Sequence, residues 1–463
     1  MLVSIPQYIS RSHCGYCDDS EKDDFYALES QLHSHPFEKK SVIIGSVAQF
    51  TCQEYDELMN IGYRRSGDFI YKSDLLKTCC RLYTIRTCLS MCKLTKEHRK
   101  VINRFIKEIC PDLPPAKKNT FDLERLYEAQ IQSTRFRTKF EPAGYSDEKF
   151  ALYKKYQVTI HNDDPEDVSE TSFERFLCHT PFPEKEVKGD SDQFDGLKLE
   201  SWTENNKLRI GPTHECYYLD DKLIAISVID FLPSGVSSVY FIWDPDYAYL
   251  SLGTLSGLKE LQMCDKLGYD WYYLGLYVED CPKMRYKQKF GGEILDLCNE
   301  VYFPFDKVNP FLANGRLFVA GAKGETYDKE FELESNGYPI DYKDSIFNDR
   351  ELINIAEDIY GNDKVLMEAQ VVRKILQEDF NIPELDSQIS LPVQVPGIIP
   401  LWQILDWFLT GVLDDNFTVK VLLRGRPMKL ALGDMTGEAR SIVINFIRVF
   451  GLERTSEMLI RFQ

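Results

Sequence analysis

The chain has 463 residues, of which 43% are apolar, 13% aromatic and 28% charged, and its formal net charge is −18. This composition is typical of a folded protein with more than one hydrophobic core, and it excludes an intrinsically disordered chain. No run approaches the roughly 18 consecutive apolar residues that a membrane helix needs, and residues 1–6 show no signal-peptide pattern. We therefore expect no membrane anchor and a cytoplasmic protein, with the nucleus as a further location.

Residues 1–110 are expected to form a cysteine-rich, metal-binding N-terminal domain. The chain has thirteen cysteines, an odd number, and no visible export signal, so metal ligation is favoured over a disulfide framework. Cys14 and Cys17 have the spacing of a tetrahedral thiolate site, and the adjacent Cys79 and Cys80 would complete four ligands; Cys88 and Cys92 could substitute for the second pair. Four sulfur ligands suit either zinc or an iron–sulfur cluster, and the sequence leaves both open.

Positive charge is concentrated in residues 61–160, which hold 21 Lys and Arg against 11 Asp and Glu in an otherwise acidic chain. This asymmetry indicates a polyanion site of limited extent. Paired arginines on the glycine-flanked turn 62–67, with aromatic residues close behind, can grip phosphates and stack on bases; a solvated basic surface is the alternative. The candidate phosphate ligands are Arg64, Arg65, Lys77, Arg81, Arg86, Lys154 and Lys155.

Residues 111–200 are expected to form a basic, helical region that connects two domains. A helix over about 96–110 ends at Pro111, and a helical pattern resumes over 121–156. A further short helix is expected over 170–178, before a polar and charged stretch that is typical of a flexible linker.

Residues 201–344 change to a period of two, which predicts strands over 213–219, 222–231 and 237–243. An amphipathic helix over 251–267 and a strand over 270–277 follow. This order is that of an acetyltransferase-like (GNAT) domain, so we expect an α/β (α+β) fold. The glycine-rich loop that binds the pyrophosphate of coenzyme A in such domains is missing, and coenzyme A is not expected.

Two segments of this domain could bind a charged ligand. Ser251 can cap the helix that follows it and aim the helix N-terminus at a carbonyl or phosphate. After the last predicted strand, four cationic or phenolic side chains fall within five residues and could hold a carboxylate or a phosphate, although the start of a surface helix is an alternative. These residues are Lys283, Arg285, Tyr286 and Lys287.

Residues 345–463 are expected to form a helical C-terminal extension. Helical patterns cover 345–380, 401–413 and 437–450, and the proline-rich stretch 381–400 separates the first two. This part of the chain contains no motif that indicates chemistry.

Taken together, the motifs resemble those of the arginyl-tRNA–protein transferase family. They span residues 14–287, about 60% of the chain. Tyr63 stands where Trp is expected and Trp243 where Tyr or Phe is usual, and both keep an aromatic ring. The matching stretches are 14–17, 62–67, Cys79-Cys80 with 83–86, 173–178, 223–228 through 237–240, 244–247, 250–253 and 281–287.

The resemblance implies an enzyme that transfers arginine from arginyl-tRNA to the α-amine of proteins beginning with Asp or Glu. Such transfer marks the acceptor protein for ubiquitin-dependent degradation. The resemblance also implies a metal-binding N-terminal domain and an acetyltransferase-like catalytic domain, and we expect the chain to act as a monomer.

The donor is an activated ester, so the enzyme mainly needs proximity, oxyanion donors and a mild proton acceptor. A cation must pair with the acceptor carboxylate, and an acidic group should pair with the arginyl guanidinium. The residues assigned to these tasks are Lys283, Arg285 and Lys287 for the acceptor carboxylate or the tRNA terminus, Asp244 or Asp246 for the guanidinium, and His214 or Tyr240 for the proton. Tyr286 and Ser251 are further candidate substrate-binding residues.

Two other functions remain open. A non-catalytic metal–thiolate adaptor with a degenerate acetyltransferase fold would bind tRNA without transferring arginine. An ordinary acetyltransferase would bind acetyl-coenzyme A.

Overall fold

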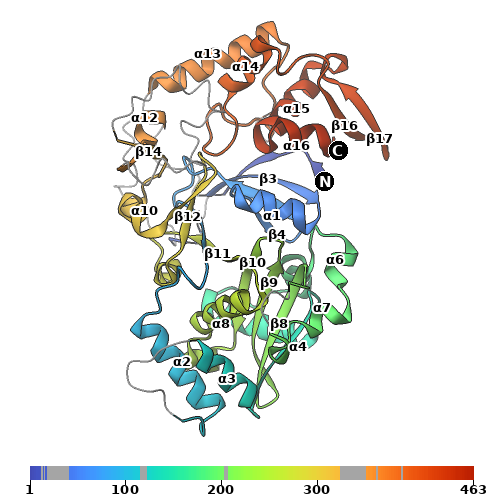
Figure 1. Cartoon of the computed structure of the whole chain (residues 1–463). Helices are drawn as coiled ribbons and strands as arrows, with labels where there is room; N and C mark the ends of the chain where they lie inside the picture. The colour runs from blue at the N-terminus through green and yellow to red at the C-terminus, as the bar shows by residue number, and fades with distance from the viewer. Residues whose placement is uncertain are drawn as a thin grey trace.

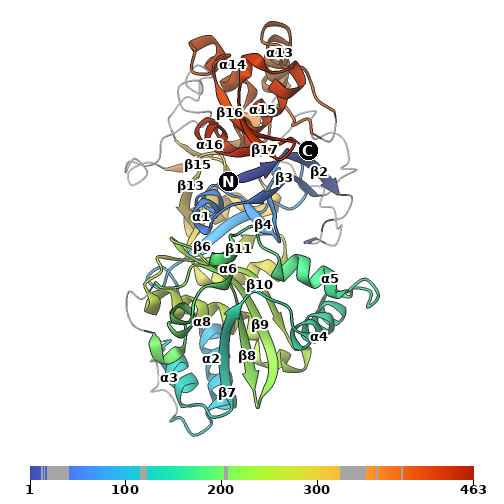
Figure 2. The same ribbon diagram turned by 90° about the vertical axis from the view of Figure 1, so that its right-hand side faces the viewer.

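The computed structural model of the chain describes residues 1–11, 14, 16–17, 41–114, 123–202, 207–323, 351–360, 363–386 and 389–462. It is a mixed α/β protein organised around two large sheets (Figures 1 and 2). In this part of the chain no helix is both long enough and apolar enough to cross a membrane.

The first sheet has the strand order β17-β16-β18-β1-β3-β5-β4, with β2 paired to β3. It therefore combines strands from the two ends of the chain, and the two termini lie side by side in Figure 1. Its strands are β1 (Leu2–Ser4), β2 (Gln7–Arg11), β3 (Ser41–Gln49), β4 (Arg64–Ser66), β5 (Phe69–Ser73), β16 (Thr418–Leu423), β17 (Arg426–Ala431) and β18 (Leu459–Arg461).

The second sheet has the order β13-β12-β6-β11-β10-β9-β8-β7, and a small third sheet pairs β14 (Ala320–Ala322) with β15 (Leu352–Asn354). In the second sheet β9 is buried along nearly its whole length, and strands flank it on both sides. The strands are β6 (Tyr83–Thr87), β7 (Phe136–Pro142), β8 (Gly211–Leu219), β9 (Lys222–Phe231), β10 (Gly235–Trp243), β11 (Trp271–Tyr277), β12 (Glu293–Asp296) and β13 (Val301–Pro304).

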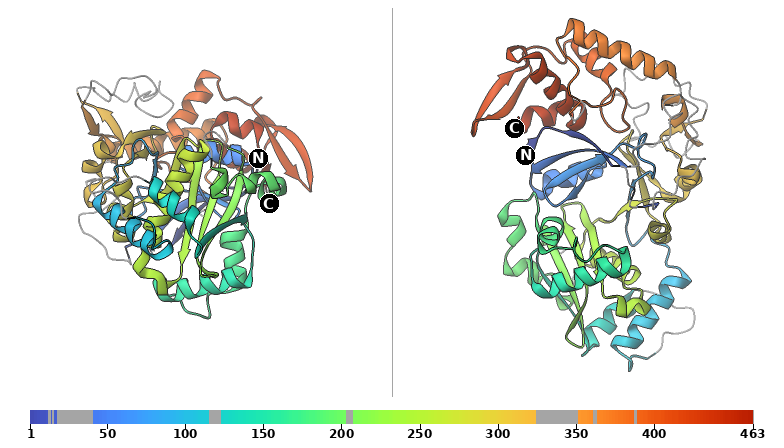
Figure 3. Two further views of the ribbon diagram at one scale, coloured as in Figure 1. Left: turned by 60° about the horizontal axis from the view of Figure 1, so that its bottom comes forward. Right: turned by 180° about the vertical axis from the view of Figure 1, so that it is seen from behind.

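Helices pack around both sheets; α2 and α8 lie together beside the second sheet, and α13–α16 lie beyond the first (Figures 1 and 3). The helices are α1 (Cys52–Asn60), α2 (Lys96–Ile109), α3 (Glu124–Gln132), α4 (Asp147–Tyr156), α5 (Glu170–Phe173), α6 (Glu184–Lys188), α7 (Ser191–Asp195), α8 (Leu252–Leu267), α9 (Pro282–Arg285), α10 (Phe305–Leu312), α12 (Ala356–Tyr360), α13 (Asp363–Asp379), α14 (Leu401–Thr410), α15 (Gly437–Phe450) and α16 (Leu452–Glu457).

The predicted succession of strands and helix between residues 211 and 277 is confirmed to within two residues by β8, β9, β10, α8 and β11. The predicted helices 96–110, 401–413 and 437–450 are confirmed as α2, α14 and α15. These segments are long and strongly periodic, so local pattern was sufficient to find them.

The expected helical C-terminal extension is only partly helical, and β15 lies inside the helical pattern expected over 345–380. Strands β16, β17 and β18 lie in the extension, and β18 pairs in parallel with β1, which extends the first sheet. A second correction concerns 121–156, where β7 interrupts the expected helical pattern. In both places pairing with a distant strand, which local periodicity does not report, decided the structure.

The sheets also cross the segments that the sequence suggests as domains. β6 comes from residues 1–110 and β7 from residues 111–200, yet both are strands of the second sheet. The sheet thus joins strands from three of the predicted segments, and the boundaries at residues 110, 200 and 344 stay predictions from the sequence.

A buried ion pair joins the two sheets. Arg65 of β4 donates from Nε and Nη2 to the two carboxylate oxygens of Asp230 in β9, each at 2.6 Å, and the side chains are only 3% and 0% exposed. The remaining guanidinium nitrogen, Nη1, donates to Gly67 O at 3.3 Å. Arg65, a predicted phosphate ligand, is thus committed to contacts inside the protein.

Replacing Arg65 with Ala should lower the free energy of unfolding by about 3–5 kcal/mol, because Asp230 would keep a buried, uncompensated charge. Urea denaturation followed by circular dichroism measures the change. Removing both charges in Arg65→Ala/Asp230→Ala should recover part of the loss. A double variant that is less stable by the full sum of the single losses would contradict this assignment.

Candidate active site and metal centre

Four thiols form the candidate metal centre, and they are the four predicted from the sequence. The sulfur atoms of Cys14, Cys17, Cys79 and Cys80 all lie within 4.8 Å of one another, and Cys17 Sγ is 3.7 Å from Cys79 Sγ. Zn–S bonds of about 2.3 Å place the sulfurs of a tetrahedral site roughly 3.8 Å apart, so this donor set fits one tetrahedral ion.

A turn after β5 positions the second cysteine pair. The buried Asp74 carboxylate accepts hydrogen bonds from the backbone N–H of Leu76 at 2.9 Å and from Tyr8 Oη at 2.7 Å. The thiols also interact with one another: hydrogen bonds from Cys79 and Cys80 hold the pKa of Cys14 below its usual range. A thiolate is the form that binds a metal.

The strands β10 and β11 separate beside this centre. They run parallel and pair only over Gly235–Ser237 and Trp271–Tyr273. A register shift follows in each strand, between Ser238 and Tyr240 in β10 and after Tyr273 in β11. We call this point the strand divergence; the Leu276 carbonyl of β11 accepts a hydrogen bond there from a side chain of the segment that follows β11.

Lys287 lies at the strand divergence. Its Nζ donates to Leu276 O at 2.7 Å, and a Cβ atom at Gly275 would lie 3.7 Å from this Nζ and 3.5 Å from Ser238 O. Gly275 has φ +83°, a conformation that favours glycine. Burial lowers the pKa of Lys287 to about 7, and the Arg64 guanidinium adds to this shift.

Arg64 supplies a second buried cation near Lys287. The residue is 7% exposed, and its Nη1 donates to Tyr63 O at 3.2 Å. Its Nε and Nη2 are buried and have no hydrogen-bond partner within the described ranges. No ion pair with a carboxylate is found there for either Arg64 or Lys287. Buried donors without partners are costly, so the arrangement fits an anionic ligand such as a carboxylate.

Tyr240 lies on the β10 side of the same divergence. Its Oη donates to Gln157 Oε1 at 3.0 Å and is 3.2 Å from His161 Nε2. Both partners belong to a π-helical turn over Gln157–His161, and such turns are frequent at functional sites. Burial lowers the pKa of His161, and the charge of Lys283 lowers it further, so Lys283 lies near this group.

His214, the other predicted proton acceptor, has a different environment. It is fully buried, with Nε2 3.0 Å from Leu177 O and Nδ1 3.1 Å from Lys149 Nζ. Burial and the charge of Lys149 lower its pKa to about 3. Both ring nitrogens are therefore occupied by contacts inside the protein.

Asp244 and Asp246 are brought together with two lysines. Lys155 Nζ is 2.5 Å from Asp244 Oδ1 and 2.6 Å from Asp246 Oδ2, and Lys222 Nζ is 2.8 Å from Asp244 Oδ2. Burial raises the pKa of Asp244, but the hydrogen bonds from both lysines outweigh it and the net shift is downward. An arginyl guanidinium could reach the buried Asp244 only by displacing a lysine, whereas the Asp246 side chain is 66% exposed and pairs with lysine through Oδ2.

Two other predicted tRNA ligands, Arg86 and Arg81, make their contacts inside the protein. Arg86 pairs with Glu293 at 2.9 Å, and its guanidinium lies 3.8 Å and 3.6 Å from the ring centroids of Trp271 and Tyr302. Arg81 is 3% exposed and donates to Thr78 O at 3.0 Å. Lys77 and Lys154 are half-buried.

The remaining predicted ligand residues lie near the helix ends. Ser251 occupies the N-cap position of α8 but makes no capping bond; its Oγ accepts from Arg104 Nη2 at 2.7 Å instead. Lys283, Arg285 and Tyr286 are exposed, and Arg285 Nε donates to the Glu279 carbonyl at 3.2 Å. Of the segment 283–287, therefore, only Lys287 is enclosed.

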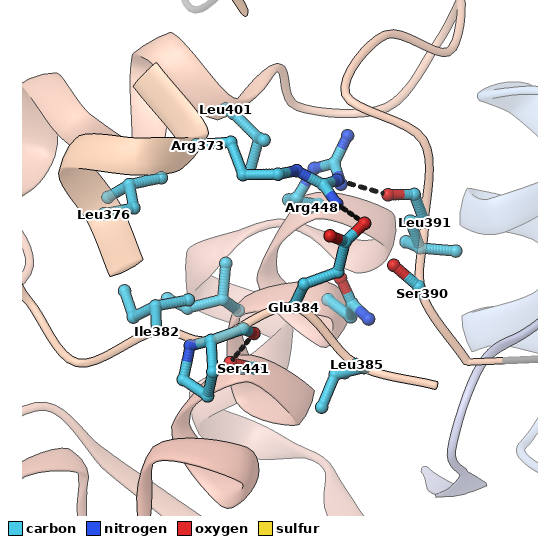
Figure 4. A pocket seen from close by; sticks show the side chains of 13 residues that line it. Arg373, Leu376, Ile382, Glu384, Leu385, Ser390, Leu391, Leu401, Ser441 and Arg448 are labelled. Carbon is cyan, nitrogen blue, oxygen red and sulfur yellow. Dashed lines mark hydrogen bonds and ion pairs between the residues drawn. The ribbon is translucent and has the colours of Figure 1, made fainter. Parts of the chain in front are cut away.

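A small cavity of about 40 Å³ lies elsewhere, in the C-terminal region (Figure 4). Arg373 pairs there with Glu384 at 2.6 Å, and the buried Arg448 donates to the carbonyls of Ile399 and Pro392 at 3.1 and 2.7 Å. None of the residues predicted from the sequence lines this cavity, and its arginines bond to neighbouring groups of the same region.

Known proteins share the segments that build the site. The family descriptions "Arginine-tRNA-protein transferase, N terminus" and "Arginine-tRNA-protein transferase, C terminus" match residues 12–100 and 148–296. The chain is 38% identical to arginyl-tRNA–protein transferase 1 of Saccharomyces cerevisiae, over 96% of this chain and 95% of that protein. The chain belongs to the arginyl-tRNA–protein transferase family.

More distant relatives agree with this membership. Arginyl-tRNA–protein transferase 1 of Drosophila melanogaster is 27% identical over 65% of this chain and 82% of its own. The aspartate/glutamate leucyltransferase of Vibrio campbellii is 27% identical over 60% of this chain and 87% of its own. A solved C-terminal domain of a putative lysylphosphatidylglycerol synthetase from Agrobacterium fabrum covers 51% of this chain and 54% of its own, at 10% identity and a TM-score of 0.24, too low to indicate a shared fold.

In this arginyl-tRNA–protein transferase family member, sequence reasoning missed His161, Gln157 and Gly275. His161 and Gln157 lie just past an ordinary helix, and no spacing pattern links them to Tyr240. Gly275 sits in a predicted strand, and an isolated glycine there signals a bulge or a close approach, a cue that the sequence offered.

Replacing Cys14 and Cys17 together with Ser should release the bound metal, because two of four sulfur ligands are lost. Elemental analysis of the purified protein measures metal content, and the melting temperature should fall with it. Cys52→Ser is the matched control, since Cys52 is buried outside the metal centre. Full metal retention by the double variant would remove these residues from the ligand set.

Proposed function

We propose that this chain transfers the arginyl group of arginyl-tRNA to the α-amine of proteins that begin with Asp or Glu. Family membership over nearly the whole chain supports an aminoacyltransferase that uses arginyl-tRNA. The observation that supports an acidic acceptor is the pair of buried cations, Arg64 and Lys287, without a carboxylate partner among the described residues. The Vibrio campbellii relative is likewise named for aspartate and glutamate.

The acceptor side chain would bind between Arg64 and Lys287. Asp and Asn differ by one negative charge at nearly the same size, so discrimination needs a cation in a partly desolvated place. The free Nε and Nη2 of Arg64 present two parallel donors to one carboxylate. The exposed Lys283 and Arg285 then remain for the tRNA terminus.

In the transfer step, the neutral α-amine attacks the ester carbonyl carbon, a C–N bond forms, and the ester C–O bond breaks. The terminal ribose oxygen of the tRNA leaves as a hydroxyl group, with the proton that the amine gives up. The amine has a pKa near ~8, so a useful fraction is neutral at physiological pH. One of the two protons of the amine must leave as the amide forms. Tyr240 and His161 would take this role, because His161 is neutral and lies 3.2 Å from the Tyr240 hydroxyl.

The second sheet would act as an acetyltransferase-like catalytic domain. The succession β8, β9, β10, α8 and β11, with the separation of β10 from β11, supports this assignment. Coenzyme A is not part of the proposal, since the ester of arginyl-tRNA already activates the acyl group.

A single tetrahedral zinc ion is the metal that best suits the compact thiol cluster, and an iron–sulfur cluster is the alternative. Bound there, the ion would stabilise the loops that carry the cysteines. These loops lie near the segment that follows β11: burial raises the pKa of Tyr16, and nearby Tyr71, Cys14 and Cys281 raise it further. Elemental analysis combined with visible absorption separates the two metals, since zinc thiolates are colourless.

The acceptor proteins would thereby be marked for ubiquitin-dependent degradation, in the cytoplasm and the nucleus, by a monomeric enzyme. The deciding experiment combines the purified chain with labelled arginine, tRNA, arginyl-tRNA synthetase and a protein beginning with Asp. Incorporation of label at the acceptor N-terminus supports the proposal. Binding of tRNA without incorporation would instead identify a non-catalytic adaptor.

Lys287→Met should raise the apparent KM for acceptors beginning with Asp and reduce the preference for Asp over Asn by roughly 30- to 1,000-fold. A partly desolvated charge pair worth about 2–4 kcal/mol is lost in this variant. Steady-state kinetics with both acceptors measures the change. Lys289→Gln removes the same charge from the same turn, where Lys289 pairs with Glu97 at 2.6 Å, and should keep the parental preference. An unchanged preference in Lys287→Met would place the carboxylate reader elsewhere.

The preference for Asp over Asn should also fall as the pH rises above about 7. Lys287 binds a carboxylate only when protonated, and its pKa is lowered to about 7, so the free enzyme loses this cation above that pH. The ratio of kcat/KM for the two acceptors isolates this effect, because deprotonation of the α-amine affects both alike. A ratio that stays constant from pH 6 to pH 9 would contradict the role of Lys287.

A further inference from the structure

The β16–β17 hairpin carries positive charge without acidic partners. Residues 416–431 contain no Asp or Glu in a chain whose net charge is −18. The side chains from Leu423 to Lys429 are all exposed, and none of the hairpin cations forms an ion pair with a carboxylate in the described part of the chain. The four cations are Lys420, Arg424, Arg426 and Lys429. In Figures 1 and 3 the hairpin projects from the edge of the first sheet.

Two features of the hairpin cost stability. Lys420 and Lys429 are direct cross-strand partners, so two like charges face each other on one side of the ribbon. Arg424 has φ +49° and Gly425 φ +76° in the two-residue turn, where Asn-Gly would be favoured and an arginine is strained. A polyanion bound to the hairpin would reduce the repulsion between the two lysines and would pair with the strained Arg424.

The position of the hairpin relates it to the candidate active site. β17 and β4 are the opposite edges of the first sheet, six strand steps apart, which is roughly 30 Å at about 4.8 Å per step. β4 carries Arg64. Across the sheet, Arg64 pairs with Tyr71, and Tyr71 pairs with Gly45. In the register of β3 with β1, Gly45 lies beyond the C-terminal end of β1. β16 runs in the same direction as β1, because both pair in parallel with β18. Arg64 and the hairpin turn thus lie at the same end of the strands.

We propose that the β16–β17 hairpin is a contact for the acceptor-stem backbone of arginyl-tRNA, which has its aminoacyl end at the strand divergence. The proposal rests on the proposed function for the identity of the polyanion. An RNA whose 3′ end reaches Arg64 and Lys287 passes from a short single strand into a double helix, and phosphates of that helix can lie 30 Å away. The hairpin thereby gives the C-terminal region a role in tRNA binding that its sequence did not indicate.

The test measures binding of an unmodified arginine-tRNA transcript by fluorescence anisotropy over a range of salt concentrations. Arg424→Gln/Arg426→Gln should weaken binding roughly 10-fold and lower the slope of log Kd against log salt by about 2. The control Lys188→Gln/Lys198→Gln removes two exposed charges that are paired with Glu184 and Asp195, and should change neither quantity. Equal affinity and slope in the hairpin variant and the parent would overturn the proposal.

A single substitution separates binding from stability. Arg424→Asn places a favoured residue in the turn and removes one charge, so the melting temperature should rise while tRNA affinity falls. A variant with raised stability and unchanged tRNA affinity, or one that loses only binding to vesicles of anionic lipid, would also overturn the proposal.

The transfer assay distinguishes this proposal from the proposed function. Arginine transfer by the parent together with unchanged tRNA binding by the hairpin variants refutes the hairpin contact alone. Absence of transfer by the parent refutes the proposed function, whatever the hairpin binds.

Discussion

The Arg65–Asp230 ion pair fixes how the two sheets meet, and the candidate site depends on that arrangement. β4 is only three residues long and lies at a sheet edge, so its own backbone pairing with β5 holds it weakly. The buried, bidentate contact to β9 anchors it to the centre of the second sheet. Arg64 then lies close enough to Lys287 for its charge to lower the pKa of that lysine.

Contacts from the C-terminal region also stabilise β5 and the residue that precedes β4. Tyr63 Oη donates to the Val449 carbonyl, its ring stacks on Phe450 at 5.6 Å, and Lys72 Nζ donates to Gly397 O at 2.5 Å. Parallel pairing of β18 with β1 continues the sheet into this region. Residues near the C-terminus therefore stabilise the segment that carries Arg64, although they lie far from it in sequence.

The molecule also illustrates how an acidic protein can use a polyanionic substrate. Many of its cations are neutralised locally, as Lys155 and Lys222 are by Asp244, and contribute little to an external field. Among the residues that the structure describes, cations without carboxylate partners are found instead at the strand divergence and on the β16–β17 hairpin. Charge that remains uncompensated at a few places can direct an anion there, even when the net charge of the chain is −18.

The sequence by itself determined the family, the four cysteines of the candidate metal centre and the strand–helix order between residues 211 and 277. These features rest on local spacing and periodicity, which are visible in one dimension. It could not assign roles to the two neighbouring arginines of the turn 62–67. Adjacent residues of a strand point to opposite faces, so Arg65 meets Asp230 while Arg64 keeps its donors free for a ligand.

Tertiary structure likewise decided the surroundings of His214 and Lys287. Both are polar residues in or near a predicted strand, but burial and contact with Lys149 occupy both nitrogens of His214, whereas Lys287 lies at the strand divergence with a lowered pKa. It also decided that β16, β17 and β18 join a sheet that begins at residue 2. Pairing between strands more than 400 residues apart depends on the folded arrangement, and a local sequence pattern carries no record of it.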